Sequence, residues 1–148
     1  MGLIGTLLGQ TPLEEVRTAP PGTTWRRVRP KPGPAVRAEP ARRDARVETG
    51  QGKLRARKGQ DVIVHHPDGQ CSVIRGDIFA RTYEPVGGGL YRKRTDVVLR
   101  YFTLNRHVLV ETLEGPQHAA PGDWIMQGVT GELWPVPRDR AQEKYQPV

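Results

Sequence analysis

The feature that most constrains the fold of this chain is a stretch that occurs twice. Residues 58–86 read KGQDVIVHHPDGQCSVIRGDIFARTYEPV, and residues 120–148 read APGDWIMQGVTGELWPVPRDRAQEKYQPV. Laid over each other without a gap, the two stretches share Asp61/Asp123, Ile63/Ile125, Gly69/Gly131, Asp77/Asp139, Tyr83/Tyr145, Pro85/Pro147 and Val86/Val148. A match of this length predicts an internal duplication.

The match continues upstream, where Val47-Glu48-Thr49 aligns with Val110-Glu111-Thr112 after a shift of one residue. Modules of roughly 60 residues are marginal alone, so we expect the two copies to pack together in a pseudo-twofold arrangement. The expected class is α+β, predominantly β, with each small module closed by a short helix. The predicted division is an N-terminal arm with linker at 1–23, module one at 24–86, a glycine linker at 87–90 and module two at 91–148.

Local signals predict the same series of elements in both copies. In module one, strands at 62–64 and 71–74 flank the turn Pro67-Asp68-Gly69. A short helix capped by Asp77 follows, with Phe79 and Tyr83 on one face, and Pro85 ends it.

In module two, β-rich runs at 97–104 and 107–113 predict a hairpin turning at Asn105-Arg106. Strands at 124–126 and 133–136 follow around a second turn. Asp139 with Gln142 resembles a capping box and predicts a final helical turn.

The first residues leave two interpretations open. Thr11 could cap a short helix, with Pro12 and the acidic pair in its first turn, so one interpretation is a frayed arm or a short helix covering an exposed edge. The alternative is a docking peptide for a protein partner or a second copy, because apolar side chains recur at helical spacing ahead of a Pro-rich spacer. The docking side chains would be Leu3, Ile4, Leu7 and Leu8.

Positive charge gathers in one part of the chain. Residues 25–58 hold twelve Lys and Arg against Glu39, Asp44 and Glu48, although the whole chain carries only +7. One interpretation is a solvated, Arg-rich segment, and the other is a binding face for nucleic acid or another polyanion. The candidate binding residues are Arg26, Arg27, Arg29, Arg42, Arg43, Arg55, Arg57 and Arg92.

Several classes of site find no support in the sequence. The single cysteine, Cys71, excludes an intramolecular disulfide and a cysteine zinc cluster. Adjacent His65 and His66 point to opposite faces of a strand, which is a poor start for a metal site. We therefore expect no metal, no cofactor and no catalytic residue. No segment has the ~20 apolar residues of a membrane span, so we expect a cytoplasmic protein or one within a phage-like particle.

Motifs in the second half resemble a known family. The stretches Glu111-Thr112-Leu113-Glu114-Gly115, Pro121-Gly122-Asp123-Trp124 and Gly131-Glu132 are similar to those of small phage and prophage proteins of the PGDYG type, and Tyr91-Arg92-Lys93-Arg94 resembles their start. The resemblance covers 91–148 well and 25–86 weakly. It implies a phage-related origin and an α+β fold, without a mechanism. Asn105 stands where such proteins carry a longer insertion.

A candidate pocket in module two involves Asp123, Trp124, Glu132 and Trp134. Asp123 and Glu132 could form a carboxylate pair, or Asp123 could cap its turn while Glu132 pairs with an arginine. The aromatic side chains could stack on bases, or fill the core. Module one replaces Glu132 with Gln70, so module two is the better place for such a site.

The sequence as a whole predicts a non-enzymatic, phage- or prophage-related accessory binding protein. Its basic face would engage nucleic acid or another polyanion. The alternative is a structural or assembly protein that docks through its N-terminal apolar peptide onto a larger particle.

Overall fold

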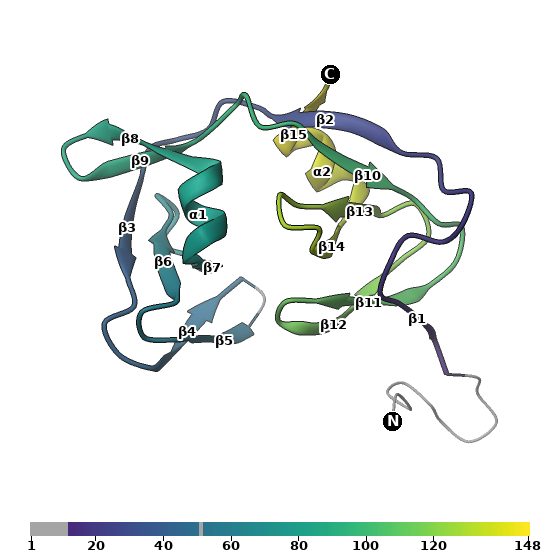
Figure 1. The fold of residues 1–148 in the computed structure, drawn as a ribbon, viewed down its shortest axis with the longest axis horizontal. Helices are drawn as coiled ribbons and strands as arrows, with labels where there is room; N and C mark the ends of the chain where they lie inside the picture. The colour runs from purple at the N-terminus through teal and green to yellow at the C-terminus, as the bar shows by residue number, and fades with distance from the viewer. Residues whose placement is uncertain (1–11, 51) are drawn as a thin grey trace. The chain divides into compact units, whose positions relative to one another are not determined.

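The computed structural model describes residues 12–50 and 52–148. The chain divides into two compact units (Figure 1). Unit 1 combines Met1–Lys31 with Val98–Val148, and unit 2 is the continuous segment Pro32–Val97. The chain therefore passes from unit 1 into unit 2 and back again.

Among the residues that the structure describes, strands dominate both units and each unit has one short helix, which confirms a predominantly β protein of the α+β kind. In unit 1 the elements are β1 (Glu14–Val16), β2 (Arg26–Pro30), β10 (Leu99–Phe102), β11 (Val108–Thr112), β12 (Gly115–Ala119), β13 (Trp124–Gln127), β14 (Leu133–Val136), α2 (Arg138–Lys144) and β15 (Tyr145–Pro147). In unit 2 they are β3 (Val36–Pro40), β4 (Ala45–Thr49), β5 (Gly52–Ala56), β6 (Asp61–His65), β7 (Cys71–Arg75), α1 (Gly76–Thr82), β8 (Tyr83–Gly87) and β9 (Leu90–Lys93).

Unit 2 is a single sheet in the order β5-β4-β7-β6-β3-β9-β8. All pairings are antiparallel except that of β4 with β7, which meet at Thr49 and Cys71. One face of the sheet packs on α1, where Val36, Val64 and Phe79 form a buried cluster. Phe79 stacks on Tyr83 with ring centroids 4.7 Å apart, as the predicted i, i+4 spacing requires.

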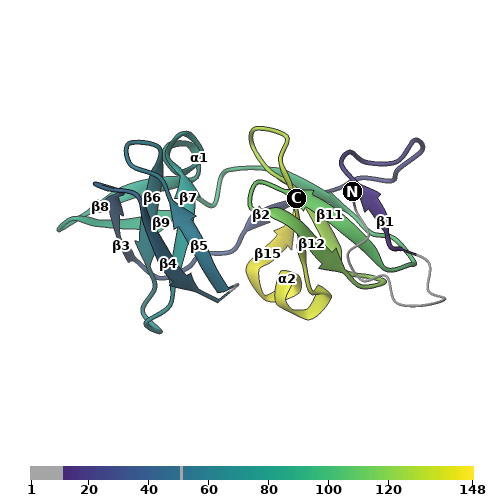
Figure 2. The ribbon, with the colours of Figure 1, turned by 90° about the horizontal axis from the view of Figure 1, so that it is seen from below.

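Unit 1 has a five-stranded sheet in the order β14-β13-β10-β2-β15 and a three-stranded sheet in the order β1-β11-β12. The five strands follow the same neighbour order as β7-β6-β3-β9-β8 of unit 2, and the hairpin β11–β12 matches β4–β5. Unit 1 adds β1, which pairs in parallel with β11 (Figure 2).

The strand β2 takes the place in unit 1 that β9 takes in unit 2. Val28 of β2 lies opposite Leu99, just as Tyr91 of β9 lies opposite Val36. Both strands also pair with the strand that follows the helix, β15 in unit 1 and β8 in unit 2. Each of the two thus lies between corresponding strands in the same register.

The turns repeat as well. Gly69 and Gly131 have φ of 87° and 86° in the turns of the β6–β7 and β13–β14 hairpins. In the other hairpin of each unit, the hydroxyl of Thr49 donates to the carbonyl of Gly52, and Thr112 does the same to Gly115, both at 2.7 Å. The predicted hairpins 62–74 and 124–136 are therefore confirmed in turn position, and their strand limits agree within one residue.

The predicted hairpin at Asn105-Arg106 is wrong. In the structure β10 pairs with β13 and β2, whereas β11 pairs with β1 and β12. The two strands belong to different sheets because their apolar side chains face a common core from two sides. Phe102 of β10 and Val108 of β11 both enter that buried cluster.

Three local predictions at helix ends and in the arm are also wrong. The helix α1 has Arg75 at its N-cap, α2 has Pro137, and neither makes a side-chain capping bond. Asp77 instead binds Arg75, with Nε–Oδ1 at 2.6 Å. The segment expected as an N-terminal helix contains β1, because the edge of β11 supplies partners for an extended backbone.

The segment predicted as a glycine linker has a defined place. Gly87, Gly88 and Gly89 all have positive φ; Gly87 ends β8, and Gly88 and Gly89 form the turn to β9. The chain instead divides between Lys31 and Pro32 and between Val97 and Val98. Strand β2 accordingly belongs to unit 1, and β9 belongs to unit 2.

Candidate polyanion-binding site

The hairpin β4–β5 of unit 2 presents two arginines directly opposite each other. Arg46 and Arg55 are cross-strand partners, and both are exposed. Side chains in such a pair stand about 5 Å apart at Cβ, and like charges there destabilise the sheet. None of the described residues forms an ion pair with Arg46, so the repulsion finds little internal compensation.

Further positive charges flank this pair. Arg42 and Arg43 are exposed in the turn that leads into β4, and exposed Lys58 follows β5. The backbone N–H of Lys58 donates to Asp44 Oδ1 at 2.8 Å, which brings the turn and the end of the hairpin together. We call the set of Arg42, Arg43, Arg46, Arg55 and Lys58 the hairpin basic patch.

Two carboxylates lie near the hairpin basic patch: Glu48, the cross-strand partner of Lys53, and Asp44 at the start of the hairpin. Asp44 is the one that contacts a residue of the patch through its side chain. Its Oδ2 lies 3.8 Å from Arg55 NH2, and both side chains are well exposed. An ion pair of this kind contributes little in water. The patch therefore keeps a clear excess of positive charge, and unit 2 as a whole has thirteen Lys and Arg against eight Asp and Glu.

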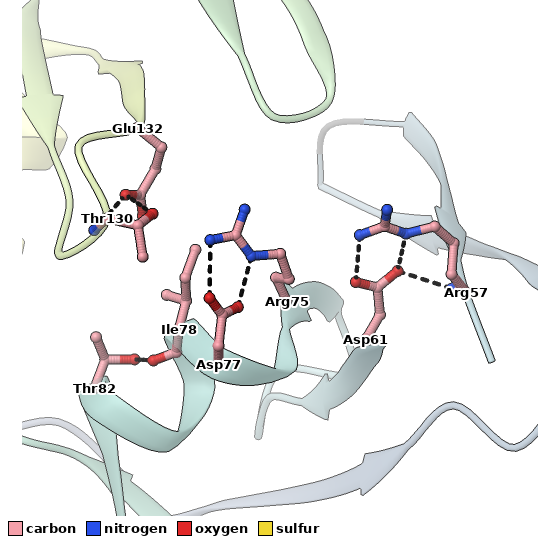
Figure 3. A network of polar contacts seen from close by, with 8 residues as sticks. All are labelled: Arg57, Asp61, Arg75, Asp77, Ile78, Thr82, Thr130 and Glu132. Carbon is pink, nitrogen blue, oxygen red and sulfur yellow. Dashed lines mark hydrogen bonds and ion pairs between the residues drawn. The ribbon is translucent and has the colours of Figure 1, made fainter. Parts of the chain in front are cut away.

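Arg57, although predicted to bind an anion, has an internal partner. Its guanidinium donates to both carboxylate oxygens of Asp61, at 3.0 and 3.1 Å, and its backbone N–H donates at 2.8 Å (Figure 3). Burial raises the pKa of Asp61, but these hydrogen bonds outweigh it, so the pKa lies below its ordinary value. The Asp61 side chain is only 4% exposed. Arg57 serves the fold of unit 2.

The other predicted arginines are spread over both units. Arg26, Arg27 and Arg29 lie on β2 in unit 1, where Arg27 faces Arg100 across the sheet. Arg26 lines a hollow of about 470 Å³ together with Tyr101 and Thr23. Arg92 lies on β9 in unit 2 and donates to the carbonyl of Gly33 at 3.2 Å. The predicted set is therefore divided between the two units, and within unit 2 Arg92 on β9 is separated from β4 and β5 by three strands of the sheet.

The candidate carboxylate pair of module two does not form. Asp123 precedes β13 and accepts the backbone N–H of Ala120 at 2.9 Å, which closes its turn as expected. Glu132 lies at the other end of the β13–β14 hairpin and accepts both the N–H and the hydroxyl of Thr130. With the hairpin between them, the carboxylates stand on the order of 13 Å apart along the strands. No arginine among the described residues binds Glu132.

The aromatic residues of that pocket belong to the fold. Trp124 is 8% exposed and stacks on Tyr101 with centroids 3.7 Å apart and planes at 3°. Trp134 is half-buried opposite Met126 on the neighbouring strand. These rings fill one side of the unit 1 sheet and are not arranged as an open stacking platform.

The histidines lie in three places. His65 and His66 do point to opposite faces, since His66 contacts Ser72 Oγ at 2.7 Å while His65 contacts Cys71 Sγ at 3.4 Å. His107 Nδ1 and His118 Nε2 lie 2.9 Å apart on the exposed side of the β11–β12 hairpin. Across the described ranges, no group of three His, Cys, Asp or Glu could hold a metal ion.

Two further predictions concern the N-terminal residues and a membrane span. The docking side chains Leu3, Ile4, Leu7 and Leu8 lie outside the described residues, so docking through them stays a prediction. Among the helices of the described part, none is long and apolar enough to cross a membrane.

Arg46 is the residue that the sequence prediction missed. Arg46 lies in the basic segment, but the arginines predicted from the sequence were chosen by charge density and not by strand pairing. The matched Thr49/Gly52 turn fixes the register of the hairpin, and counting back from it places Arg46 opposite Arg55. That turn signal was available in the sequence.

Searches for known proteins add no further constraint. Neither protein-family models, nor curated proteins, nor solved structures give a match to this chain.

Proposed function

We propose that this chain is a non-enzymatic binding protein whose unit 2 engages the phosphate backbone of nucleic acid through the hairpin basic patch. The observation that carries the proposal is the exposed cross-strand pair Arg46 and Arg55. Two guanidinium groups facing each other are unfavourable until an anion lies between them. A phosphate supplies that anion, and release of its counterions makes binding favourable.

The patch contacts phosphates and lacks the means to read bases. Arginines on a short exposed hairpin, without an open aromatic platform beside them, favour backbone contacts over stacking. We therefore expect binding with weak sequence preference and strong salt dependence. A phage-related origin, which the PGDYG-like motifs imply, is part of this proposal.

We also infer that the chain is a tandem duplication in which the two repeats have exchanged their first strands. Strand β2 heads the first repeat but completes unit 1, and β9 heads the second repeat but completes unit 2. The matching registers of β2 and β9 support this inference. Both repeats keep the same strand order. We place the binding function in unit 2, because its β4–β5 hairpin carries the exposed arginines.

The direct test is fluorescence anisotropy with labelled single-stranded DNA, duplex DNA and RNA. The variant R42Q/R43Q/R46Q/R55Q removes four exposed charges from unit 2. We expect its affinity to fall at least about 10-fold at low salt, since each lost phosphate contact weakens binding.

A matched control removes four exposed charges from unit 1, in the variant R26Q/R27Q/R138Q/R140Q. It should lose no more than about 3-fold, as expected from the change in overall charge. Equal losses in the two variants would show that only total charge matters and would refute a site on the hairpin. Absence of binding by the unaltered protein would refute the proposal outright.

A further inference from the structure

Three polar side chains from three neighbouring strands of unit 2 lie in a row. Cys71 on β7 has its Sγ 3.4 Å from His65 Nδ1 on β6. The other ring nitrogen, His65 Nε2, lies 3.6 Å from Glu39 Oε1 on β3. The order is thiol, imidazole, carboxylate, which is the order of a nucleophile, its base and the group that orients the base.

The sheet itself holds this row together. His65 and Cys71 are direct cross-strand partners, and Glu39 lies two residues along β3 from Arg37, the residue directly opposite His65. A carboxylate at Nε2 favours the imidazole tautomer with its hydrogen on Nε2, which leaves the lone pair of Nδ1 facing the thiol. The ring is thus set to accept the thiol proton.

The row lies on the face of the sheet that is less covered in unit 2 than in unit 1. The corresponding positions of unit 1 are Phe102, Gln127 and Leu133, and there Phe102 and Leu133 are buried in an apolar cluster with Val16 of β1. In unit 2, Cys71 is half-buried, and the side chain of His65 is 29% exposed. Small electrophiles in solution can therefore approach the sulfur.

We propose that Cys71 is a nucleophilic thiol, activated by His65 and positioned through Glu39, that forms mixed disulfides with small disulfides. The thiol proton passes to His65 Nδ1, and the thiolate attacks one sulfur of the disulfide. The new Cys71 S–S bond forms as the old S–S bond breaks. The leaving thiolate takes up the proton from His65 or from water, so no other oxidant is needed.

The test measures the rate at which the full chain reacts with 2,2′-dithiodipyridine between about pH 5 and 9, read from the released thiopyridone. A free thiol reacts more slowly as the pH falls below a pKa near ~8.5, whereas an imidazole-assisted thiol keeps its rate at lower pH. We expect the native protein at pH 6 to react at least about 10-fold faster than the same chain unfolded in urea. Equal rates, or a single rise near the free-thiol pKa, would overturn the proposal without any variant.

Three variants locate the effect. His65→Gln should reduce the rate at pH 6 by about 10-fold, and Glu39→Gln by about 2- to 5-fold. His66→Gln is the matched control, because His66 is adjacent but contacts Ser72 on the other face, and its rate should not change. Equal losses in His65→Gln and His66→Gln would contradict the assignment.

Charged side chains on the same face of the sheet also act on the thiolate of Cys71. The charged side chains that share this face are Arg37 and Glu39 on β3, Asp61 on β6, Arg75 on β7, Arg92 on β9 and Glu84 on β8. On β4 the neighbour of Cys71 is Thr49, which is uncharged. Arg37→Gln should change the low-pH rate little, because the base at Nδ1 remains in place.

Discussion

The two units share one strand order, but the side chains on one face of the sheet differ between them. In unit 1, Phe102, Ile125 and Leu133 enter a buried cluster that β1 helps to close. In unit 2 the corresponding positions hold Glu39, Ile63 and Cys71, and Ile63 is only half-buried. The same arrangement of strands and turns thus accepts either an apolar core or a row of polar groups on this face of the sheet.

The outer face of the hairpin differs in the same direction. Leu109 and His118 are cross-strand partners on β11 and β12, at the places that Arg46 and Arg55 take in unit 2. Leu109 is buried, whereas both arginines are exposed. This position of the hairpin is therefore packed into the protein in unit 1, whereas it carries exposed positive charge in unit 2.

The largest expected difference comes from one matched pair of core truncations. Ile125→Ala should destabilise unit 1 by about 3–4 kcal/mol, because a fully buried side chain leaves a cavity. Ile63→Ala should cost unit 2 about 1–2 kcal/mol, since its side chain is already partly exposed to water.

Tryptophan fluorescence separates the two units in this experiment, because Trp25, Trp124 and Trp134 all lie in unit 1. Amide hydrogen exchange in unit 2 gives the other stability. If Ile63→Ala proves as costly as Ile125→Ala, the inner face of unit 2 is closed in solution, and the comparison of the two cores fails.

A second pair concerns the turn aspartates. Asp61→Asn removes the charge that Arg57 binds and should destabilise unit 2 by about 2 kcal/mol. Asp123→Asn changes a carboxylate that accepts a hydrogen bond from the backbone N–H of Ala120, and should cost about 1 kcal/mol. Urea unfolding of both variants measures the difference, and a larger loss for Asp123→Asn would reverse the roles given to the two turns.

The same contact predicts how unit 2 responds to acid. The pKa of Asp61 is lowered in the folded state, so its contribution is fully present above the unfolded value near ~3.9 and is lost as pH falls through the folded pKa. Unit 2 should therefore lose stability below about pH 4, and Asp61→Asn should lose less over that range. Hydrogen exchange as a function of pH tests this, and identical acid sensitivity in the variant would rule out Asp61 as the cause.

The smallest effects should be equal in the two units. Gly69 and Gly131 have nearly the same positive φ, and a Cβ at either position would meet nothing within 4 Å. Replacing each with Ala should cost about 1 kcal/mol from backbone strain alone. Thermal unfolding checks this, and clearly unequal losses would argue that the turns are not the shared part of the frame.

Turn glycines and strand alternation were enough to predict the hairpins 62–74 and 124–136 and both short helices. They were not enough to pair the remaining strands. Nothing within residues 25–30 shows that β2 joins β10 and β15, since that pairing depends on partners distant in the chain. Likewise β1 forms only because β11 offers an open edge, which outweighs the local helix signal of its sequence.

The candidate site, like the fold, could be predicted only in part from the sequence. Charge density indicated the segment that holds the hairpin basic patch, but it grouped Arg57, which binds Asp61, with Arg55, which is exposed. Spacing alone could not show that His65 and Cys71 are cross-strand partners or that Glu39 lies beside them. Those contacts depend on the registers of three strands.

The claim that unit 2 binds phosphates through its hairpin is tested most directly by salt dependence. The affinity for one duplex DNA is measured across about 50 to 200 mM salt for the unaltered protein, R46Q/R55Q and the unit 1 control R138Q/R140Q. Each lost phosphate contact lowers the slope of log affinity against log salt by about 0.9, so R46Q/R55Q should have a slope smaller by about 2. The control should keep the slope of the unaltered protein. An unchanged slope in R46Q/R55Q, or the same reduction in R138Q/R140Q, would contradict the account.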